Sequence, residues 1–456
     1  MRLRSFLRYL LPLLALLAMV PLSLWYGLAA RFAPDDAMNL GQVLRDGWEK
    51  LLRSQVDFLH STYRPLGGLF YLAVYKQFGL DPLPYRIVLH AALAVNVWLA
   101  FRLAWLLSRS HAVAALTATG FGYHAAQFNL HFETSVVYDV LCTFFYLLAL
   151  CLYVGPRVRR QPLGLARGAA IAAAYVAAMN AKEMAVSLPV ALLLFEAVYF
   201  RRLSLRAVAL PGALGLLTGL YIWGRLRGPD ALGQMNGYVP QLGVGAWLEA
   251  RAHQAAELLY RTRDFGPREF LVFLGGMLLL ALLTRRRWVW WAVGFWVIAA
   301  LPVDFIRPLR GGANLYLPLL GYALLVAALL VSVSRRLIRK PRARMAVLSL
   351  LALLYVGKLY RSRAEQGPPW VASQELTWNY IQQLRAVPGL RAGQSIVFLN
   401  DPFEVWDMYF LTQIVLGDPA PNITLQRMLP KPLTEAELAG FDRVLTVENG
   451  RVRLIR

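Results

Sequence analysis

The sequence predicts an α-helical membrane protein with about eleven transmembrane helices, further interfacial helices and a small soluble α/β domain at the C-terminus. Three observations support this fold class. Of the 456 residues, 58% are hydrophobic and only 16% are charged, whereas soluble domains carry roughly 25% charged residues. Apolar stretches of about 20 residues, the length that crosses a bilayer, recur along the chain. Short basic tracts separate these stretches, which is typical of cytoplasmic loops.

The apolar stretches and the basic tracts predict the same topology. We place the spans at residues 6–30, 84–107, 111–128, 134–154, 164–181, 184–200, 207–224, 268–284, 288–305, 314–334 and 343–360. With the N-terminus in the cytoplasm, every basic tract between spans falls on the cytoplasmic side, as the positive-inside rule requires. The same clustering argues against nucleic-acid binding as the reason for the net charge of +22. We therefore expect an integral protein of a bacterial inner membrane, embedded in the lipid bilayer.

The chain is predicted to consist of two domains. Residues 1–360 form the transmembrane domain, which has two long extracytoplasmic loops at residues 31–83 and 225–267. Residues 361–456 form an extracytoplasmic α/β domain. Its predicted elements are a buried strand, an amphipathic helix and a β-hairpin with the turn Asn449-Gly450, at residues 395–399, 404–416 and 444–455.

The first outer loop contains two predicted helices. Residues 37–53 place apolar side chains on one helical face and polar ones elsewhere, so this helix would lie flat in the membrane interface. Residues 65–79 are apolar but too short to span a bilayer, and we interpret them as a second interfacial or re-entrant helix.

Two adjacent acids, Asp35 and Asp36, stand between the first apolar stretch and the amphipathic helix. An aspartate in this position can cap the helix by accepting hydrogen bonds from free backbone N–H groups. It can also act as a general base that deprotonates an acceptor hydroxyl at the boundary between lipid and water. Both interpretations stay open, with one aspartate for each role.

The outer end between the third and fourth spans is rich in polar residues, among them His124 and Glu133. Such residues could bind a metal ion or serve as acid–base groups, and hydrogen bonding at the interface is the simpler alternative. Their spacing matches no specific metal motif, so a divalent metal is not favoured and no metal ligand is assigned.

Several cations are predicted on the outer side, against the positive-inside trend. Arg307 and Arg310 precede two glycines and suit bidentate phosphate binding, with snorkelling toward lipid headgroups as the alternative. Arg64 in the first outer loop is a second phosphate-binding candidate. Lys182 and Glu183 form either a solvated turn or a functional ionisable pair.

The order of these signals resembles the GT-C class of polytopic glycosyltransferases, closest to its protein O-mannosyltransferase-like and transmembrane-TPR O-mannosyltransferase-like branch. The resemblance covers roughly residues 5–330. The sequence departs from that pattern because no TPR array follows the last span, and because His124-Ala125 and His131-Phe132-Glu133 replace the His-Pro and His-x-x-Glu forms. The matching pieces are Asp35-Asp36, Tyr63-Arg64-Pro65-Leu66, residues 85–96 with His90, the loop from His124 to Glu133, Ala181-Lys182-Glu183 and Asn314-Leu315-Tyr316-Leu317-Pro318.

The resemblance implies an inverting glycosyltransferase of the hexosyl or mannosyl type. Its donor would be a sugar linked to polyprenyl phosphate, and its acceptor would be an extracytoplasmic protein, glycan or lipid. Asp36, or else Asp35, would be the general base. Lys182, Arg307 and Arg310 would hold the phosphate leaving group. The full set of substrate-binding residues would be Arg64, His124, Glu133, Lys182, Glu183, Arg307, Arg310 and Tyr316.

Two other functions remain as alternatives. A transporter or flippase of a lipid-linked or anionic solute would place ionisable residues near the membrane midplane and would contain repeated halves. Here most charges lie at the predicted helix ends and no repeat is found. A non-catalytic membrane scaffold would use the C-terminal domain to bind a partner, so its membrane part alone would have no activity.

Overall fold

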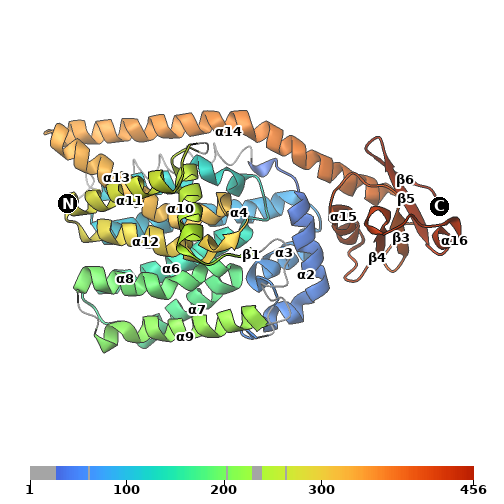
Figure 1. The fold of residues 1–456 in the computed structure, drawn as a ribbon, viewed down its shortest axis with the longest axis horizontal. Helices are drawn as coiled ribbons and strands as arrows, with labels where there is room; N and C mark the ends of the chain where they lie inside the picture. Colours follow the sequence, from blue (N-terminus) through green and yellow to red (C-terminus); the bar gives the residue numbers. More distant parts are fainter. Residues whose placement is uncertain (1–26, 60–61, 202–203, 228–238, 262–263) are drawn as a thin grey trace.

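The computed structural model describes residues 27–59, 62–201, 204–227, 239–261 and 264–456. They form a bundle of long helices, an outer layer of shorter elements at one end of it, and a small α/β domain beyond that layer (Figure 1). The first predicted span, residues 6–30, lies almost entirely outside the described residues.

The helices of the bundle coincide with each of the other predicted spans, which confirms the polytopic fold class. Within the described ranges, seven helices are long and apolar enough to cross a membrane. The bundle consists of α4 (Pro82–Ser108), α5 (His111–Tyr123), α6 (Val137–Val158), α7 (Leu165–Ala181), α8 (Leu188–Phe200), α9 (Leu205–Arg227), α11 (Pro267–Thr284), α12 (Arg287–Asp304), α13 (Tyr316–Leu337) and the first part of α14 (Pro341–Ala386).

Three of these helices are shorter than a usual membrane span. The structure gives α5 13 residues and α7 17 residues, whereas roughly 20 residues cross a bilayer. Helix α8 also has only 13 residues, but the 3-10 turn η2 (Glu183–Ser187) before it extends this stretch to 18. The predicted span 111–128 stops at Tyr123 because His124 has an extended backbone, with φ −61° and ψ 131°. The chain then turns into a short 3-10 helix instead of continuing outward as an α-helix.

The outer layer contains the amphipathic helix that the sequence predicts. In α2 (Pro34–Arg53), proline fixes the first turn and the apolar face buries Ala37, Leu40 and Leu51. This face packs against other parts of the protein, namely α3 and helix α15 of the C-terminal domain. The other elements of the layer are α3 (Pro65–Phe78), η1 (Ala125–His131), η2 (Glu183–Ser187), β1 (Val239–Pro240), α10 (Val244–Leu258), β2 (Ile306–Arg307) and η4 (Gly312–Leu315).

Helix α14 links the bundle to the C-terminal domain. It has 46 residues and continues across residue 360 as far as Ala386, so the predicted domain boundary falls inside one helix. Figure 1 shows it running along the bundle and on to the α/β domain.

The C-terminal domain is built on a four-stranded sheet with the order β4-β3-β5-β6. Strand β3 pairs in parallel with β4 and β5, and β5 pairs with β6 in an antiparallel hairpin. Asn449 and Gly450 both have positive φ angles in the turn, which confirms the predicted hairpin. The elements are β3 (Ser395–Phe398), α15 (Asp407–Leu416), β4 (Asn422–Leu425), η5 (Gln426–Met428), α16 (Glu435–Leu438), β5 (Arg443–Glu448) and β6 (Arg451–Leu454).

Candidate active site

The first turn of α2 places Asp36 inside the protein, with 1% of its surface exposed. One carboxylate oxygen, Oδ2, accepts a hydrogen bond from the backbone N–H of Ala33 at 2.8 Å. The other, Oδ1, accepts the hydroxyl of Tyr71 from α3 at 2.9 Å. Asp36 therefore makes the helix-capping contact and also belongs to a buried polar cluster. Its neighbour Asp35 is exposed.

A wholly buried arginine joins this turn to a second acidic loop. Arg86 is a residue of α4, and its Nη2 donates to the backbone carbonyls of Arg31, at 3.0 Å, and of Phe132. These carbonyls belong to the segments that carry Asp36 and Glu133. Both carboxylates also interact electrostatically with the Arg86 guanidinium. Arg86 thus holds two loops together that are distant in the sequence, and both loops lie next to its positive charge.

Burial makes both acids of this cluster weaker than usual. Loss of water raises the pKa of Asp36 to about 6, although Arg86 and the two hydrogen bonds oppose the shift. Burial also raises the pKa of Glu133 to about 7, with a further rise from the negative charges of Asp36 and Asp35. Two carboxyl groups with raised pKa values beside one arginine are able to accept and release protons near neutral pH.

Arg64 and Glu183, which the sequence places in separate turns, form an ion pair. Arg64 Nη2 lies 2.8 Å from Glu183 Oε2, and Arg64 Nε also donates to the carboxylate at 3.2 Å. The rings of Tyr63 and Tyr138 lie 4.3 and 5.5 Å from the guanidinium carbon. Arg225 of α9 also interacts with Glu183. This side of the outer layer therefore carries more positive than negative charge.

Lys182 is buried in an ion pair of its own. Its Nζ lies 2.5 Å from Asp139 Oδ1, and each side chain is less than a tenth exposed. The backbone carbonyl of Lys182 accepts the thiol of Cys142 from the same helix as Asp139. Lys182 thus ties η2 to α6, and its ammonium group already has an anionic partner.

The turn with Arg307 and Arg310 packs against the loop that precedes Glu133. Arg307 Nη2 donates to Glu249 Oε2 at 3.1 Å and to the carbonyl of Ala246 at 3.1 Å. The carbonyl of Gly312 accepts Gln127 Nε2 at 3.0 Å. Arg310 lies between these contacts in the chain. The structure therefore brings this turn and η1 together, but holds Arg307 against α10.

His124 has a different environment from Glu133, at the opposite end of η1. Its Nε2 lies 3.1 Å from the carbonyl of Leu258, and its Nδ1 accepts the N–H of Ala126 at 3.2 Å. Its ring stacks on Tyr260 with the ring centroids 4.9 Å apart. Both ring nitrogens are thus occupied, which fits a role in holding η1 against α10 better than direct contact with a substrate.

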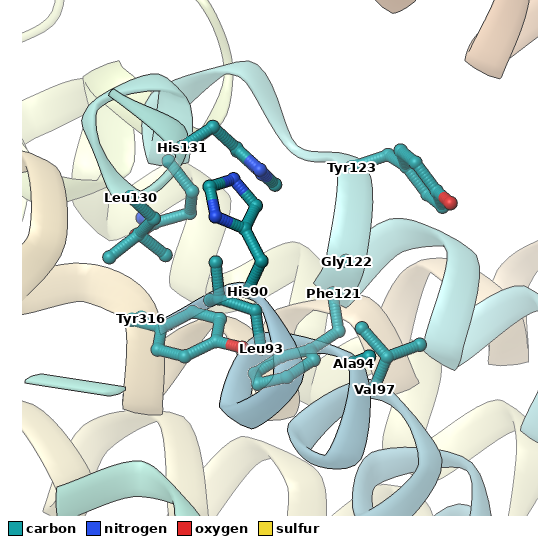
Figure 2. A pocket seen from close by; sticks show the side chains of 11 residues that line it. His90, Leu93, Ala94, Val97, Phe121, Gly122, Tyr123, Leu130, His131 and Tyr316 are labelled. Atoms are coloured by element: carbon teal, nitrogen blue, oxygen red, sulfur yellow. The ribbon is translucent and has the colours of Figure 1, made fainter. Parts of the chain in front are cut away.

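Tyr316 lines a small cavity behind the acidic cluster. The cavity has a volume of about 30 Å³, which is enough for one water molecule. Figure 2 shows the rings of His90 and His131 facing one another above Tyr316. Tyr316 itself stacks on Phe121, with the centroids 4.6 Å apart. In the part of the chain that the structure describes, no group of three His, Cys, Asp or Glu side chains could hold a metal ion.

Comparisons with known proteins find similarity only at the level of structure. No family model matches the chain, and no curated protein sequence matches it. Two crystal structures of ArnT from Cupriavidus metallidurans are similar, one bound to undecaprenyl phosphate and one in the apo state. The first is 14% identical, with coverage of 96% of this chain and 97% of ArnT and a TM-score of 0.48. The second is 14% identical, with coverage of 90% and 85% and a TM-score of 0.49. These values assign no residue role or activity to this chain.

The structure adds residues that the sequence analysis does not select. Arg86 lies within a predicted apolar span, Arg225 directly follows one, and both are buried and interact with site residues. A charged residue inside an apolar span is costly and commonly functional, so this signal could have identified Arg86. Tyr71 carries no such signal, because tyrosines are frequent in this sequence.

Proposed function

We propose that this protein is a membrane glycosyltransferase of the GT-C type, which transfers a sugar from a polyprenyl-phosphate-linked donor to a hydroxyl outside the cytoplasm. The main support is the buried Asp36 carboxylate, whose pKa of about 6 is above that of an ordinary aspartate. Such a group is mostly ionised at neutral pH and is a stronger base than an exposed aspartate. The order of motifs along the sequence supports the class, and a hexose such as mannose is the first sugar to test.

In this proposal, Asp36 acts as the general base of a single displacement. The acceptor oxygen attacks the anomeric carbon of the donor, and its proton passes to Asp36. The bond between the anomeric carbon and the phosphate oxygen breaks, and polyprenyl phosphate leaves with the bonding electrons. Tyr71, which already donates to Asp36 Oδ1, marks the position from which a substrate hydroxyl would approach. Glu133 would receive or return the proton in a second step.

The departing phosphate needs positive charge more than it needs an acid. The outer layer supplies it through the predicted cations, which we assign to the substrate site as a set. Lys182 and Arg307 each pair with a carboxylate, so they would stabilise the phosphate from a distance. Arg64 is held in place by Glu183 and would act on the same side as Arg225.

The test compares Asp36→Asn with Asp35→Asn in purified protein in lipid, with a panel of polyprenyl-phosphate sugars and acceptor mixtures. We expect Asp36→Asn to reduce transfer by about 10²–10⁴-fold and Asp35→Asn to reduce it less, because Asp35 is exposed. Thermal unfolding must first show equal stability. Activity that survives in both variants would restrict the two acids to helix capping and make Glu133 the candidate base. If the wild type consumes no donor, a transport or scaffold function becomes the better explanation.

A further inference from the structure

An apolar cavity lies between α5, α13 and α14, away from the acidic cluster. Its volume is about 280 Å³, and its walls come from membrane-spanning helices. One end is lined only by small and aliphatic side chains. The other end carries His124 and three tyrosines. The lining residues used below are Leu330, Leu351, Ala352, Tyr260, Tyr322 and Tyr355.

The aromatic end of this cavity is held in a fixed arrangement. Tyr260 stacks on His124, and the ring of Tyr322 meets His124 edge-on with centroids 5.8 Å apart. The hydroxyl oxygens of Tyr260 and Tyr355 lie 3.5 Å apart. Phenol groups are hydrogen-bond donors, so this end is suited to an anionic acceptor.

Arg363 stands beside this end, and no carboxylate of the described residues pairs with it. It lies two turns beyond Tyr355 on α14, and helical side chains lean toward the N-terminus. Its guanidinium carbon is 5.5 Å from the ring centroid of Tyr123, and it interacts electrostatically with Tyr123, Tyr355 and Tyr260. The side chain is 5% exposed. Among the described residues, Nε and Nη2 find no hydrogen-bond acceptor, and the groups that act electrostatically on this guanidinium are tyrosines and not carboxylates.

A buried guanidinium that has neither hydrogen-bond acceptors nor a carboxylate partner is stabilised by binding an anion. Moving an unpaired charge out of water costs several kcal/mol, and buried charges are therefore normally paired. Lys182, Arg64 and Arg251 follow that rule with Asp139, Glu183 and Asp304. The buried Arg86 also has two nitrogens without an acceptor, but it interacts electrostatically with Asp36 and Glu133. Arg363 is surrounded by phenol rings and histidines instead. None of the described residues supplies an anion to this guanidinium.

The position of Arg363 along α14 matches a lipid headgroup. Arg363 lies about 33 Å from Pro341 along the helix axis, at 1.5 Å per residue, and the hydrocarbon core of a bilayer is about 30 Å thick. With the predicted topology, Arg363 is at the outer headgroup level and the aliphatic end of the cavity is within the hydrocarbon. This arrangement fits a molecule with an anionic head and an apolar tail.

The head of that molecule would face the acidic cluster. Arg363 interacts electrostatically with His131 and His90, and His90 interacts in turn with Arg86. His90 Nδ1 also lies 2.7 Å from the carbonyl of Arg86. Figure 2 shows His90, His131 and Tyr123 around one small cavity. His90 thus interacts with both Arg363 and Arg86, and Arg86 contacts the acid-bearing loops.

We propose that Arg363 binds the phosphate of the polyprenyl-phosphate-linked donor, and that the cavity between α5, α13 and α14 holds the first part of its hydrocarbon chain. The proposal rests on the proposed function and deepens it, because it assigns the direct phosphate contact to a residue outside the predicted cation set. The hydroxyls of Tyr260 and Tyr355 would donate to the phosphate beside Arg363.

The experiment measures binding of a fluorescent polyprenyl phosphate to the full-length protein in nanodiscs. Arg363→Gln is expected to weaken binding by about 10–100-fold, the range for a lost hydrogen bond to a charged group, and Arg363→Lys to recover part of it. Ala352→Phe, which fills the cavity, is expected to weaken binding as well. The matched control is Arg361→Gln, because the Arg361 side chain is 84% exposed and pairs with Glu365, which is exposed as well; it should bind like the wild type. Thermal unfolding verifies the fold of each variant.

Three results would overturn the lipid site. These are unchanged binding in both Arg363→Gln and Ala352→Phe, equal loss in Arg361→Gln, and full displacement of the probe by an equal concentration of phosphatidylglycerol. The last result would make the cavity a general phospholipid site. Asp36→Asn separates this proposal from the proposed function, since it should bind the probe normally without transferring sugar. Arg363-dependent binding without any turnover in the wild type would contradict the transferase function alone.

Discussion

At the scale of single residues, the electrostatic balance around Asp36 predicts the pH dependence of the reaction. Asp36 must be ionised to act as a base, and its pKa is raised to about 6. Activity should therefore fall as the pH decreases through 6, and not only below pH 4 as for an exposed aspartate. Arg86 opposes the rise, so Arg86→Gln should move the acidic limb of the kcat/KM profile to higher pH.

Arg86→Lys is the matched variant, because it keeps the positive charge and replaces the planar guanidinium whose Nη2 donates to two carbonyls. Its acidic limb should stay near that of the wild type even if its maximal rate falls. A limb that moves equally in both variants would show that loop geometry, and not charge, sets the profile. A limb near pH 4 in the wild type would contradict Asp36 as the base.

Single residues also show what the sequence could predict of the site. The acids Asp36 and Glu133 follow from the motif order, and their position at the outer end of the bundle follows from the topology. Their contact does not, because it depends on Arg86 bridging carbonyls of segments far apart in the chain. His124 illustrates the opposite error, since nearness to Glu133 in the sequence suggests a shared site, whereas the structure holds His124 against Leu258 and Tyr260.

At the scale of elements, α14 shows why hydropathy does not predict where the last membrane-spanning helix ends. The apolar stretch finishes near residue 360, where Lys358, Arg361 and Arg363 follow one another, so hydropathy reports where the chain leaves the membrane. The helix itself continues to Ala386, since charged residues with long side chains favour helix as well. The same feature hides Arg363, which is buried although Arg361 and Glu365, two residues away on either side, are exposed.

The packing of α2 on α15 links the acidic cluster to the C-terminal domain, and Gly41 tests this link. A Cβ atom at Gly41 would lie 2.5 Å from Gln413 Oε1 and 3.1 Å from Phe410. Gly41→Leu should therefore push α15 away at a cost of about 1–3 kcal/mol. Because Asp36 lies little more than one turn before Gly41, transfer activity should fall further than stability does.

Limited proteolysis after α14 and an activity assay measure the two effects. Gly245→Leu is the control, because a Cβ atom there meets nothing within 4 Å. Equal proteolysis and equal activity in the two variants would show that α15 does not support α2.

At the scale of the whole molecule, charge distribution and fold predict one orientation. The C-terminal ends of α8 and α13, which carry Arg201 and Arg335–Arg336, lie at one end of the bundle (Figure 1). Helices α2 and α3 and the C-terminal domain lie at the other end. Basic residues concentrate on the cytoplasmic side, so Asp36 and the C-terminal domain should face outward. A donor displayed on the outer leaflet would then reach the acidic cluster without crossing the membrane.

Cysteine labelling in intact cells tests this orientation. The two native cysteines, Cys142 and Cys151, are buried and should not react with a membrane-impermeant maleimide. Lys431→Cys in the C-terminal domain should react in intact cells, whereas Arg336→Cys should react only after the membrane is opened, since both positions are exposed in the structure. The reverse pattern would place Asp36 and Arg363 on the cytoplasmic side. A lipid-linked donor would then have to bind from the inner leaflet, and the positive-inside distribution would need another cause, such as anionic lipids in the outer leaflet.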